Sequence, residues 1–184
     1  MVLLTSDARR LNPGDPAPDF SLKNVDGKRY SLADFKGRIL VLIFMCNHCP
    51  YVKAKMDEIA ALQRDYEAKG VAVIGINAND PVDYPEDDFA HMQQKAKEKG
   101  YRYYLVDETQ DTARAYGATC TPDPFVFDRQ HRLVYHGRIN NQMEPSDAVT
   151  EHTMRNVLDK AIAGEKVEEW FVPSQGCSIK WKKA

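Results

Sequence analysis

The stretch that decides the fold is RILVLIFMCNHCPYV, residues 38–52. Residues 39–45 form a continuous apolar run, which is typical of a central strand covered on both faces. The run leads into two cysteines in C-x-x-C spacing. After Pro50, apolar residues recur at helical spacing until Gly70, which predicts an amphipathic helix of roughly five turns. The cysteine pair therefore lies between a buried strand and a helix.

The rest of the chain continues this α/β pattern. Residues 71–76 form a second apolar run, so strand, helix and run predict a β-α-β unit with parallel strands. Composition and turn residues predict, in chain order, a hairpin around Asp26-Gly27, a polar loop over 77–88, a helix over 89–99, a strand over 103–106, a helix over 111–116, a hairpin of 125–128 with 133–136, a helix from the cap Ser146 to about Ala163, and a polar tail over 165–184. We expect one domain over residues 1–184, with its core at about 14–163.

The composition excludes several partner classes. The 25 Lys and Arg residues nearly cancel the 27 Asp and Glu residues, so we expect no partner among nucleic acids or anionic membranes. No run approaches the roughly 18 apolar residues that span a bilayer. The first eleven residues lack the apolar core of a secretory signal, so we expect a cytoplasmic location.

The four cysteines are Cys46, Cys49, Cys120 and Cys177. They are too few for a disulfide scaffold, and the C-x-x-C spacing indicates redox or metal chemistry. Cys46 lies where the strand meets the helix, so backbone N–H groups and the helix dipole should lower its pKa. Cys49 is then expected to attack the mixed disulfide formed at Cys46.

The two residues between these cysteines are expected to tune them. His48, beside Asn47, would add a positive charge next to the thiolate when its ring is protonated. The alternative is that His48 is an exposed loop residue without a role.

Further motifs resemble the redoxin branch of the thioredoxin superfamily, which includes alkyl hydroperoxide reductase and thiol-specific antioxidant proteins. The resemblance rests on GDPAPDFSL (14–22), LADFKG (32–37), the C-x-x-C and YGATCTPDPFVFD (116–128). It implies a thioredoxin-like α/β fold, with a central mixed sheet flanked by helices and an N-terminal β-hairpin extension. It also implies that Pro122 is cis and that Thr121 and Pro122 contact an extended substrate. CNHCPYV (46–52), NAND (77–80), YPED (84–87) and GCSIKW (176–181) resemble a narrower bacterial subgroup.

The chain departs from the family pattern at two positions. Met45 stands where a tryptophan usually precedes the first cysteine, and Leu40 stands at the position of thioredoxin's buried acid. Proton transfer therefore needs His48, solvent or a carboxylate from elsewhere. A peroxidase is the weaker alternative, because Ile43 and Cys46 occupy the positions where a peroxiredoxin has threonine, three residues before its reactive cysteine.

The other cysteines leave two questions open. Cys120 is expected near the dithiol, as an accessory redox thiol or as a buried, unreactive one. Cys177 can have a redox role or a packing role. Thiolates and imidazole suit zinc or copper, so a soft-metal protein is the rival from another class. No second close pair completes such a site, and His131 and His136 are expected to be solvated hairpin residues, so we predict no metal.

The predicted function is thiol–disulfide oxidoreduction without a cofactor. The Cys46/Cys49 pair would reduce protein or small-molecule disulfides through a mixed disulfide. A thioredoxin- or glutathione-type reductant would recharge it. The reducing direction is favoured because the cytosolic glutathione pool keeps such pairs reduced.

Overall fold

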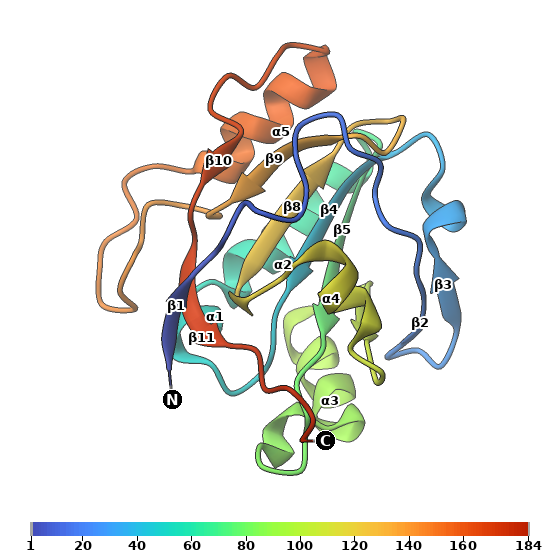
Figure 1. The fold of residues 1–184 in the computed structure, drawn as a ribbon, viewed down its shortest axis with the longest axis vertical. Coiled ribbons are helices and arrows are strands. Elements are labelled where there is room, and N and C mark those ends of the chain that lie inside the picture. Colours follow the sequence, from blue (N-terminus) through green and yellow to red (C-terminus); the bar gives the residue numbers. More distant parts are fainter. Residues whose placement is uncertain (1, 184) are drawn as a thin grey trace.

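A mixed β-sheet forms the centre of the computed structural model, which describes residues 2–183 (Figure 1). Within these residues the sheet has eight strands in the order β10-β9-β8-β4-β5-β6-β2-β3. Their bounds are β2 (Ser21–Asn24), β3 (Arg29–Ser31), β4 (Ile39–Phe44), β5 (Val71–Asn77), β6 (Tyr104–Val106), β8 (Asp123–Phe127), β9 (Leu133–Gly137) and β10 (Phe171–Val172). Strands β4, β5 and β6 are parallel, and β8 pairs antiparallel with β4. The predicted β-α-β unit and both predicted hairpins are confirmed.

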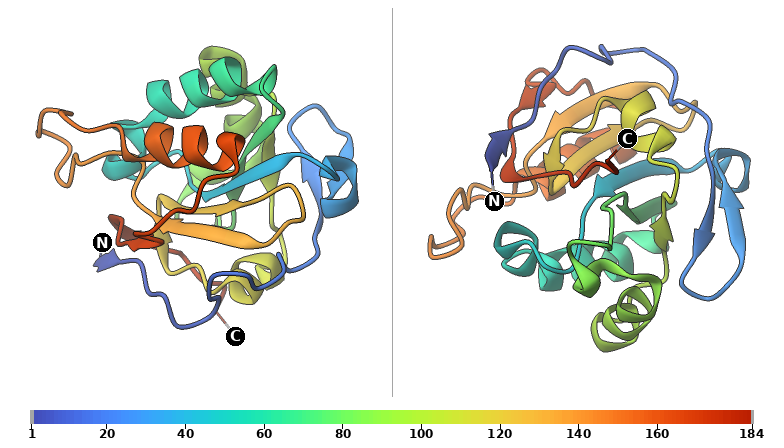
Figure 2. Two further views of the ribbon diagram at one scale, coloured as in Figure 1. Left: turned by 90° about the horizontal axis from the view of Figure 1, so that it is seen from above. Right: turned by 60° about the horizontal axis from the view of Figure 1, so that its bottom comes forward.

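Helices cover both faces of this sheet (Figure 2). They are η1 (Leu32–Phe35), α1 (Pro50–Lys53), α2 (Met56–Glu67), η2 (Pro85–Asp87), α3 (Phe89–Lys99), α4 (Asp111–Tyr116) and α5 (Thr153–Ala163). Alternate residues of β4 explain its continuous apolar sequence. Val41 and its neighbours on one face pack with residues of α2, α3 and α5, while Leu42 and its neighbours pack with α4 and η1. Among the described residues, no helix is long and apolar enough to cross a membrane.

Two helix predictions are wrong in their bounds. The single helix predicted after Pro50 is divided into α1 and α2 at Lys55, whose buried ammonium donates to the backbone and side-chain oxygens of Gln142. Ser146 does not cap the last helix, which begins only at Thr153. The Asn141 side chain accepts the backbone N–H groups of residues 150 and 151, and this holds the intervening segment as a loop.

The prediction of a solvated hairpin histidine is wrong for His136. Its ring is buried and stacks on Phe125, with ring centroids 3.9 Å apart. The Nε2 atom of this ring lies 2.7 Å from an oxygen of Asp123. Strand β10 lies beside β9 and helps to bury it. His131 is half-buried in the turn before β9, where its Nε2 contacts the Phe35 carbonyl at 3.1 Å.

The C-terminal segment is not a separate polar tail. Strand β10 joins the main sheet, and β11 (Gln175–Ser178) lies between β1 (Leu3–Thr5) and β7 (Cys120–Thr121) in a second, three-stranded sheet. The first and last parts of the chain therefore lie side by side, at the left of Figure 1. This pairing brings Cys177 to the predicted dithiol.

Candidate active site

The dithiol lies in the connection between β4 and α1. Helix α1 begins at Pro50, which suits the first helical position because its missing N–H has no partner there in any case. Cys49 is the N-cap residue, and Cys46 lies three residues earlier, in the loop after β4. Helix α1 begins at Pro50, where its pattern predicted it, so Cys49 is closer to the helix start than Cys46. Both side chains are fully buried.

Thr121 joins the cysteines to the neighbouring strand β7. Its Oγ1 lies 3.4 Å from the Cys46 Sγ, and its carbonyl oxygen lies 3.2 Å from the Cys49 Sγ. The Thr121-Pro122 peptide bond is cis, as the resemblance implied. Thr121 thus lies beside the dithiol, while the role of Thr121 and Pro122 in substrate contact stays a prediction.

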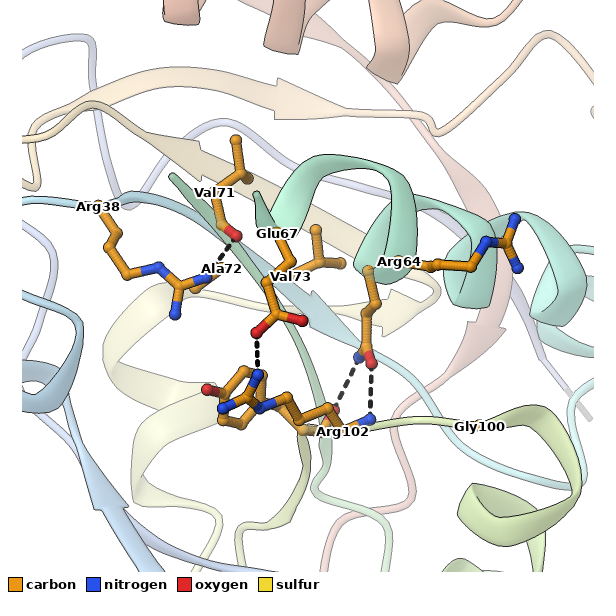
Figure 3. A pocket seen from close by; sticks show the side chains of 10 residues that line it. Arg38, Arg64, Glu67, Val71, Ala72, Val73, Gly100 and Arg102 are labelled. Carbon is orange, nitrogen blue, oxygen red and sulfur yellow. Dashed lines mark hydrogen bonds and ion pairs between the residues drawn. The ribbon is translucent and has the colours of Figure 1, made fainter. Parts of the chain in front are cut away.

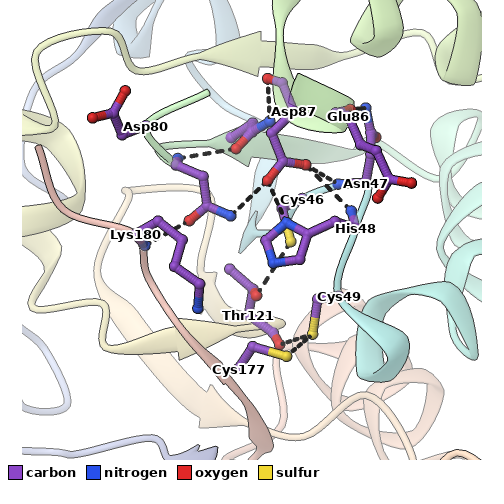
Figure 4. Close-up of polar contacts among 12 residues, drawn as sticks. Cys46, Asn47, His48, Cys49, Asp80, Glu86, Asp87, Thr121, Cys177 and Lys180 are labelled. Atoms are coloured by element: carbon purple, nitrogen blue, oxygen red, sulfur yellow. Dashed lines mark hydrogen bonds and ion pairs between the residues drawn. The ribbon is translucent and has the colours of Figure 1, made fainter. Parts of the chain in front are cut away.

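A third sulfur completes the cluster. The Cys177 Sγ lies 2.7 Å from the Cys49 Sγ, and Figure 4 shows the two sulfurs next to each other below Thr121. Cys177 pairs with Thr121 in the β11–β7 register. Sequence reasoning did not assign it to the site, because 128 residues separate the two cysteines and no spacing rule connects them.

The pKa order of the dithiol is the reverse of the prediction. Burial, the contact with Cys49 and the charge of Asp87 raise the pKa of the Cys46 thiol well above its usual value. The neighbouring thiols of Cys46 and Cys177, working against burial, lower the pKa of Cys49 to about 5. The Thr121 carbonyl opposes this, because it accepts a hydrogen bond only from the neutral thiol. The two neighbouring thiols outweigh this carbonyl, so the direction of the pKa shifts favours the thiolate at Cys49 over Cys46.

A buried histidine and carboxylate flank Cys46. The His48 Nδ1 lies 2.5 Å from Asp87 Oδ2, and the His48 ring stacks on Tyr84 with centroids 4.3 Å apart. The alternative of an exposed His48 is wrong, since the side chain is buried. Although burial alone would raise the pKa of Asp87, hydrogen bonds from His48 and Asn79 hold it below its usual value.

Asp87 supplies the carboxylate that the sequence left unidentified. The loop before α3 carries Glu86, Asp87 and Asp88 in succession, and no pattern selects one of them. The structure selects Asp87, whose Oδ1 also accepts the backbone N–H groups of Asn47, at 2.7 Å, and His48, at 3.3 Å.

Asn47 anchors the loop between the cysteines. Its side-chain amide donates to the Glu86 carbonyl at 2.8 Å, and its Oδ1 accepts from the Tyr104 hydroxyl at 3.0 Å. Asn47 therefore holds the C-x-x-C loop against β6 and η2. Asn47 thus acts on the dithiol by fixing the loop between the cysteines, and not by carrying a charge.

His48 can accept a proton from Cys46. Its Nε2 is buried and has no hydrogen-bond partner among the described residues. When Nδ1–H donates to Asp87, Nε2 keeps the lone pair that a general base needs. Ligand atoms of Cys46, His48 and Asp87 lie within 4.8 Å of one another.

The same three residues can also hold a metal ion. Within residues 2–183 no fourth His, Cys, Asp or Glu belongs to this group, whereas a structural zinc site usually has four ligands. His48 and Asp87 are moreover bonded to each other. The arrangement suits proton transfer at Cys46 better than a closed metal site.

Cys120 lies apart from these contacts. Its buried Sγ is 3.7 Å from the Pro122 carbonyl oxygen and 3.8 Å from the Ser174 hydroxyl. Burial and the nearby charge of Asp123 raise the pKa of Cys120 well above its usual value. Both features agree with the alternative of a buried, unreactive thiol.

A pocket of about 200 Å³ lies at the opposite ends of β4 and β5, away from the cysteines (Figure 3). Its charged groups already have partners, since Arg102 pairs with Glu67 and Arg38 donates to the Val71 carbonyl. It contains no cysteine or histidine. The candidate site is therefore the thiol cluster and not this pocket.

Comparison with known proteins identifies the family of this chain. Residues 13–136 match the AhpC/TSA family. The chain belongs to this family. Within the AhpC/TSA match lie both dithiol cysteines, His48, Asp87, Thr121 and Pro122, whereas β10, β11 and Cys177 lie beyond it.

Individual relatives of this AhpC/TSA chain include a thiol-disulfide oxidoreductase, ResA, from Geobacillus thermodenitrificans. It is 26% identical over 121 residues, which are 65% of this chain and 66% of that protein. The crystal structure of an uncharacterized conserved protein from Geobacillus kaustophilus is also similar, with 43% sequence identity and a TM-score of 0.93. The similarity covers 100% of this chain and 98% of that chain.

The fold also matches more distant structures. A thiol:disulfide interchange protein of the thioredoxin family from Chlorobium tepidum is 21% identical, with a TM-score of 0.64 over 85% of this chain and 99% of that chain. The predicted thioredoxin-like fold is confirmed.

Proposed function

We propose that this protein is a thiol–disulfide oxidoreductase whose Cys46/Cys49 pair reduces disulfides. The observation that carries the proposal is the buried cluster around Thr121, whose Oγ1 lies 3.4 Å from the Cys46 Sγ and whose carbonyl oxygen lies 3.2 Å from the Cys49 Sγ. The low pKa of Cys49 and the raised pKa of Cys46 make the two thiols dissimilar. A thiolate is the nucleophile of disulfide exchange, and a neighbouring thiol is needed to complete it. The ResA relatives, named thiol-disulfide oxidoreductases, support the same activity.

In the proposed reaction, the Cys49 thiolate attacks one sulfur of a substrate disulfide. The substrate S–S bond breaks, its second sulfur leaves as a thiolate that takes up a proton, and a mixed disulfide forms at Cys49. Cys46 then loses its proton to His48 Nε2 and attacks the Cys49 sulfur. The substrate is released with two thiols, and the protein keeps both oxidised sulfurs in a Cys46–Cys49 disulfide.

This order exchanges the roles that the sequence suggested for the two cysteines. Cys49 is the better nucleophile because it has the lower pKa and lies at the N-cap position of α1. Cys46 is the better resolving thiol because it is buried beside His48 and Asp87, which can take up its proton. A thioredoxin- or glutathione-type dithiol would return the pair to its reduced form.

The substrate site is proposed at the edge of β7. The backbone of Thr121 offers hydrogen bonds to an extended chain beside the Cys49 sulfur. In the described structure β11 occupies that edge. An extended protein substrate would therefore replace β11.

Reduction of insulin disulfides tests the proposal. The wild-type protein and Cys120→Ser should turn over, while Cys46→Ser and Cys49→Ser should not. For trapping, the Cys46→Ser/Cys177→Ser double variant should hold a stable mixed disulfide at Cys49, since both neighbouring thiols are gone. Trapping in a Cys49→Ser variant instead would show that Cys46 attacks. Absence of turnover by the wild type, with peroxide consumed instead, would favour a peroxidase.

A further inference from the structure

Strand β11 lies on the substrate edge of β7 as an extended substrate would. Cys177 pairs with Thr121 and Ser178 pairs with Cys120, both antiparallel. The backbones of β11 and β7 are closest at Gly176, where a Cβ atom would lie 2.0 Å from the Thr121 carbonyl oxygen. Only a glycine allows the two backbones to come this near. The chain thus carries its own strand at the site proposed for external substrates.

The sulfur on this strand is directed at the nucleophile. The Cys177 Sγ lies 2.7 Å from the Cys49 Sγ. A disulfide bond is about 2.05 Å long, so a small movement brings the two sulfurs to bonding distance. The sulfur of Cys120, the other nearby cysteine, lies instead beside the Pro122 carbonyl oxygen and the Ser174 hydroxyl.

We propose that Cys177 is a third redox-active cysteine, which exchanges with the Cys46–Cys49 disulfide and forms a Cys49–Cys177 disulfide. The proposal rests on the proposed function, because it begins from the oxidised dithiol. Strand β11 then acts as a built-in substrate, and Cys49 is shared between two alternative partners.

The step balances without an added oxidant. The Cys177 sulfur loses a proton and attacks the Cys49 sulfur, the Cys46–Cys49 bond breaks, and Cys46 leaves as a thiolate that takes up a proton. One disulfide is lost and one is formed, so no electrons enter or leave. In the reduced protein, burial and the contact with Cys49 raise the pKa of Cys177 to about 12, and the part that comes from Cys49 disappears once Cys49 is oxidised.

The contacts of the C-terminal segment connect this exchange to the rest of the site. The Ser174 hydroxyl donates to the Pro122 carbonyl at 2.6 Å, and the Lys180 N–H donates to Asn79 Oδ1 at 2.9 Å. Asn79 in turn donates to Asp87, the partner of His48. Because the segment is part of the same chain, its effective concentration at Cys49 is high, and it competes with external substrates.

Disulfide mapping of Cys46→Ser tests the proposal without relying on turnover. This variant keeps three cysteines. After oxidation with diamide, acid quenching and labelling with N-ethylmaleimide under denaturing conditions, we expect a Cys49–Cys177 peptide and a single label, at Cys120. Cys46→Ser/Cys120→Ser should form the same peptide, and Cys46→Ser/Cys177→Ser should not form an internal disulfide. Three labels, or a Cys49–Cys120 peptide, would overturn the proposal.

The wild-type protein distinguishes this result from a failure of the proposed function. After oxidation by one equivalent of diamide, its peptide map should contain both the Cys46–Cys49 and the Cys49–Cys177 disulfides. If insulin is not reduced although Cys46→Ser forms the Cys49–Cys177 peptide, the proposed function fails alone. If insulin is reduced but neither protein yields that peptide, the role of Cys177 is refuted and the dithiol mechanism stands.

Discussion

Replacing Cys46 by alanine should raise the pKa of Cys49. The interaction with the Cys46 thiol is the largest single cause of the low pKa at Cys49. Alanine removes this thiol and leaves the contact with Cys177 in place. The thiolate should therefore become less stable without being lost.

The size of the effect follows from the contacts. The pKa of Cys49 falls from 9.0 to about 5, which corresponds to about 5 kcal/mol in favour of the thiolate. A hydrogen bond to a charged group contributes about 1.5–3 kcal/mol. Loss of the Cys46 donor should thus raise the pKa of Cys49 by about 1 to 2, at 1.36 kcal/mol for each unit.

The assay is the ultraviolet absorbance of the thiolate, followed from acidic to neutral pH in the reduced protein. The wild type and the matched control Cys120→Ser should show one thiolate that titrates near pH 5. In Cys46→Ala the thiolate should titrate about 1 to 2 pH units higher. Cys49→Ser should lose the transition. If the wild type has no thiolate at neutral pH, or if Cys46→Ala leaves the transition unmoved, the assignment of the thiolate to Cys49 is refuted.

Three further predictions concern the rest of the site. Asp87→Asn removes the charge that orients His48, so release of substrate from the mixed disulfide should slow by a factor on the order of 10². Single-turnover experiments measure this rate, and an unchanged rate would exclude proton transfer from Cys46 to His48. Gly176→Ala should force β11 away from the Thr121 carbonyl and speed the reaction of Cys49 with a small aromatic disulfide; a rate at or below that of the wild type would contradict the covering role of β11. Because folding lowers the pKa of Cys49 from 9.0 to about 5, its thiolate stabilises the fold fully above pH 9 and not at all below pH 5. The difference in unfolding free energy between the wild type and Cys49→Ala, from urea unfolding under reducing conditions, should therefore rise with pH across this window by up to about 1.4 kcal/mol per pH unit, and a flat difference would be inconsistent with it.

Local sequence predicted the central part of the fold. The apolar run of β4 and the pattern of β5 required a buried parallel pair, and Asp26-Gly27 predicted the β2–β3 hairpin. These features depend on residues close in sequence, so they could be inferred from pattern alone. The break between α1 and α2 could not, because it lies at Lys55, whose ammonium binds Gln142, 87 residues away in the sequence.

The site was only partly predictable, since its decisive contacts are distant in sequence. Asp87 reaches His48 because a polar loop folds back over the C-x-x-C segment, and composition does not specify that path. Cys177 reaches Cys49 because β11 pairs with β7, although its four residues carry no strand pattern that would have distinguished them from a polar tail. The pKa order followed these contacts and not the dithiol motif.

A redox titration of the dithiol tests the central claim most directly. The protein is equilibrated in buffers of reduced and oxidised dithiothreitol or glutathione, quenched with acid, and mapped for the Cys46–Cys49 disulfide. We expect a reversible two-electron transition, in which a tenfold change in the ratio of oxidised to reduced protein corresponds to about 30 mV, and which Cys49→Ser abolishes while Cys120→Ser retains it. If Cys46 and Cys49 remain thiols in every buffer, the protein does not exchange electrons through this pair.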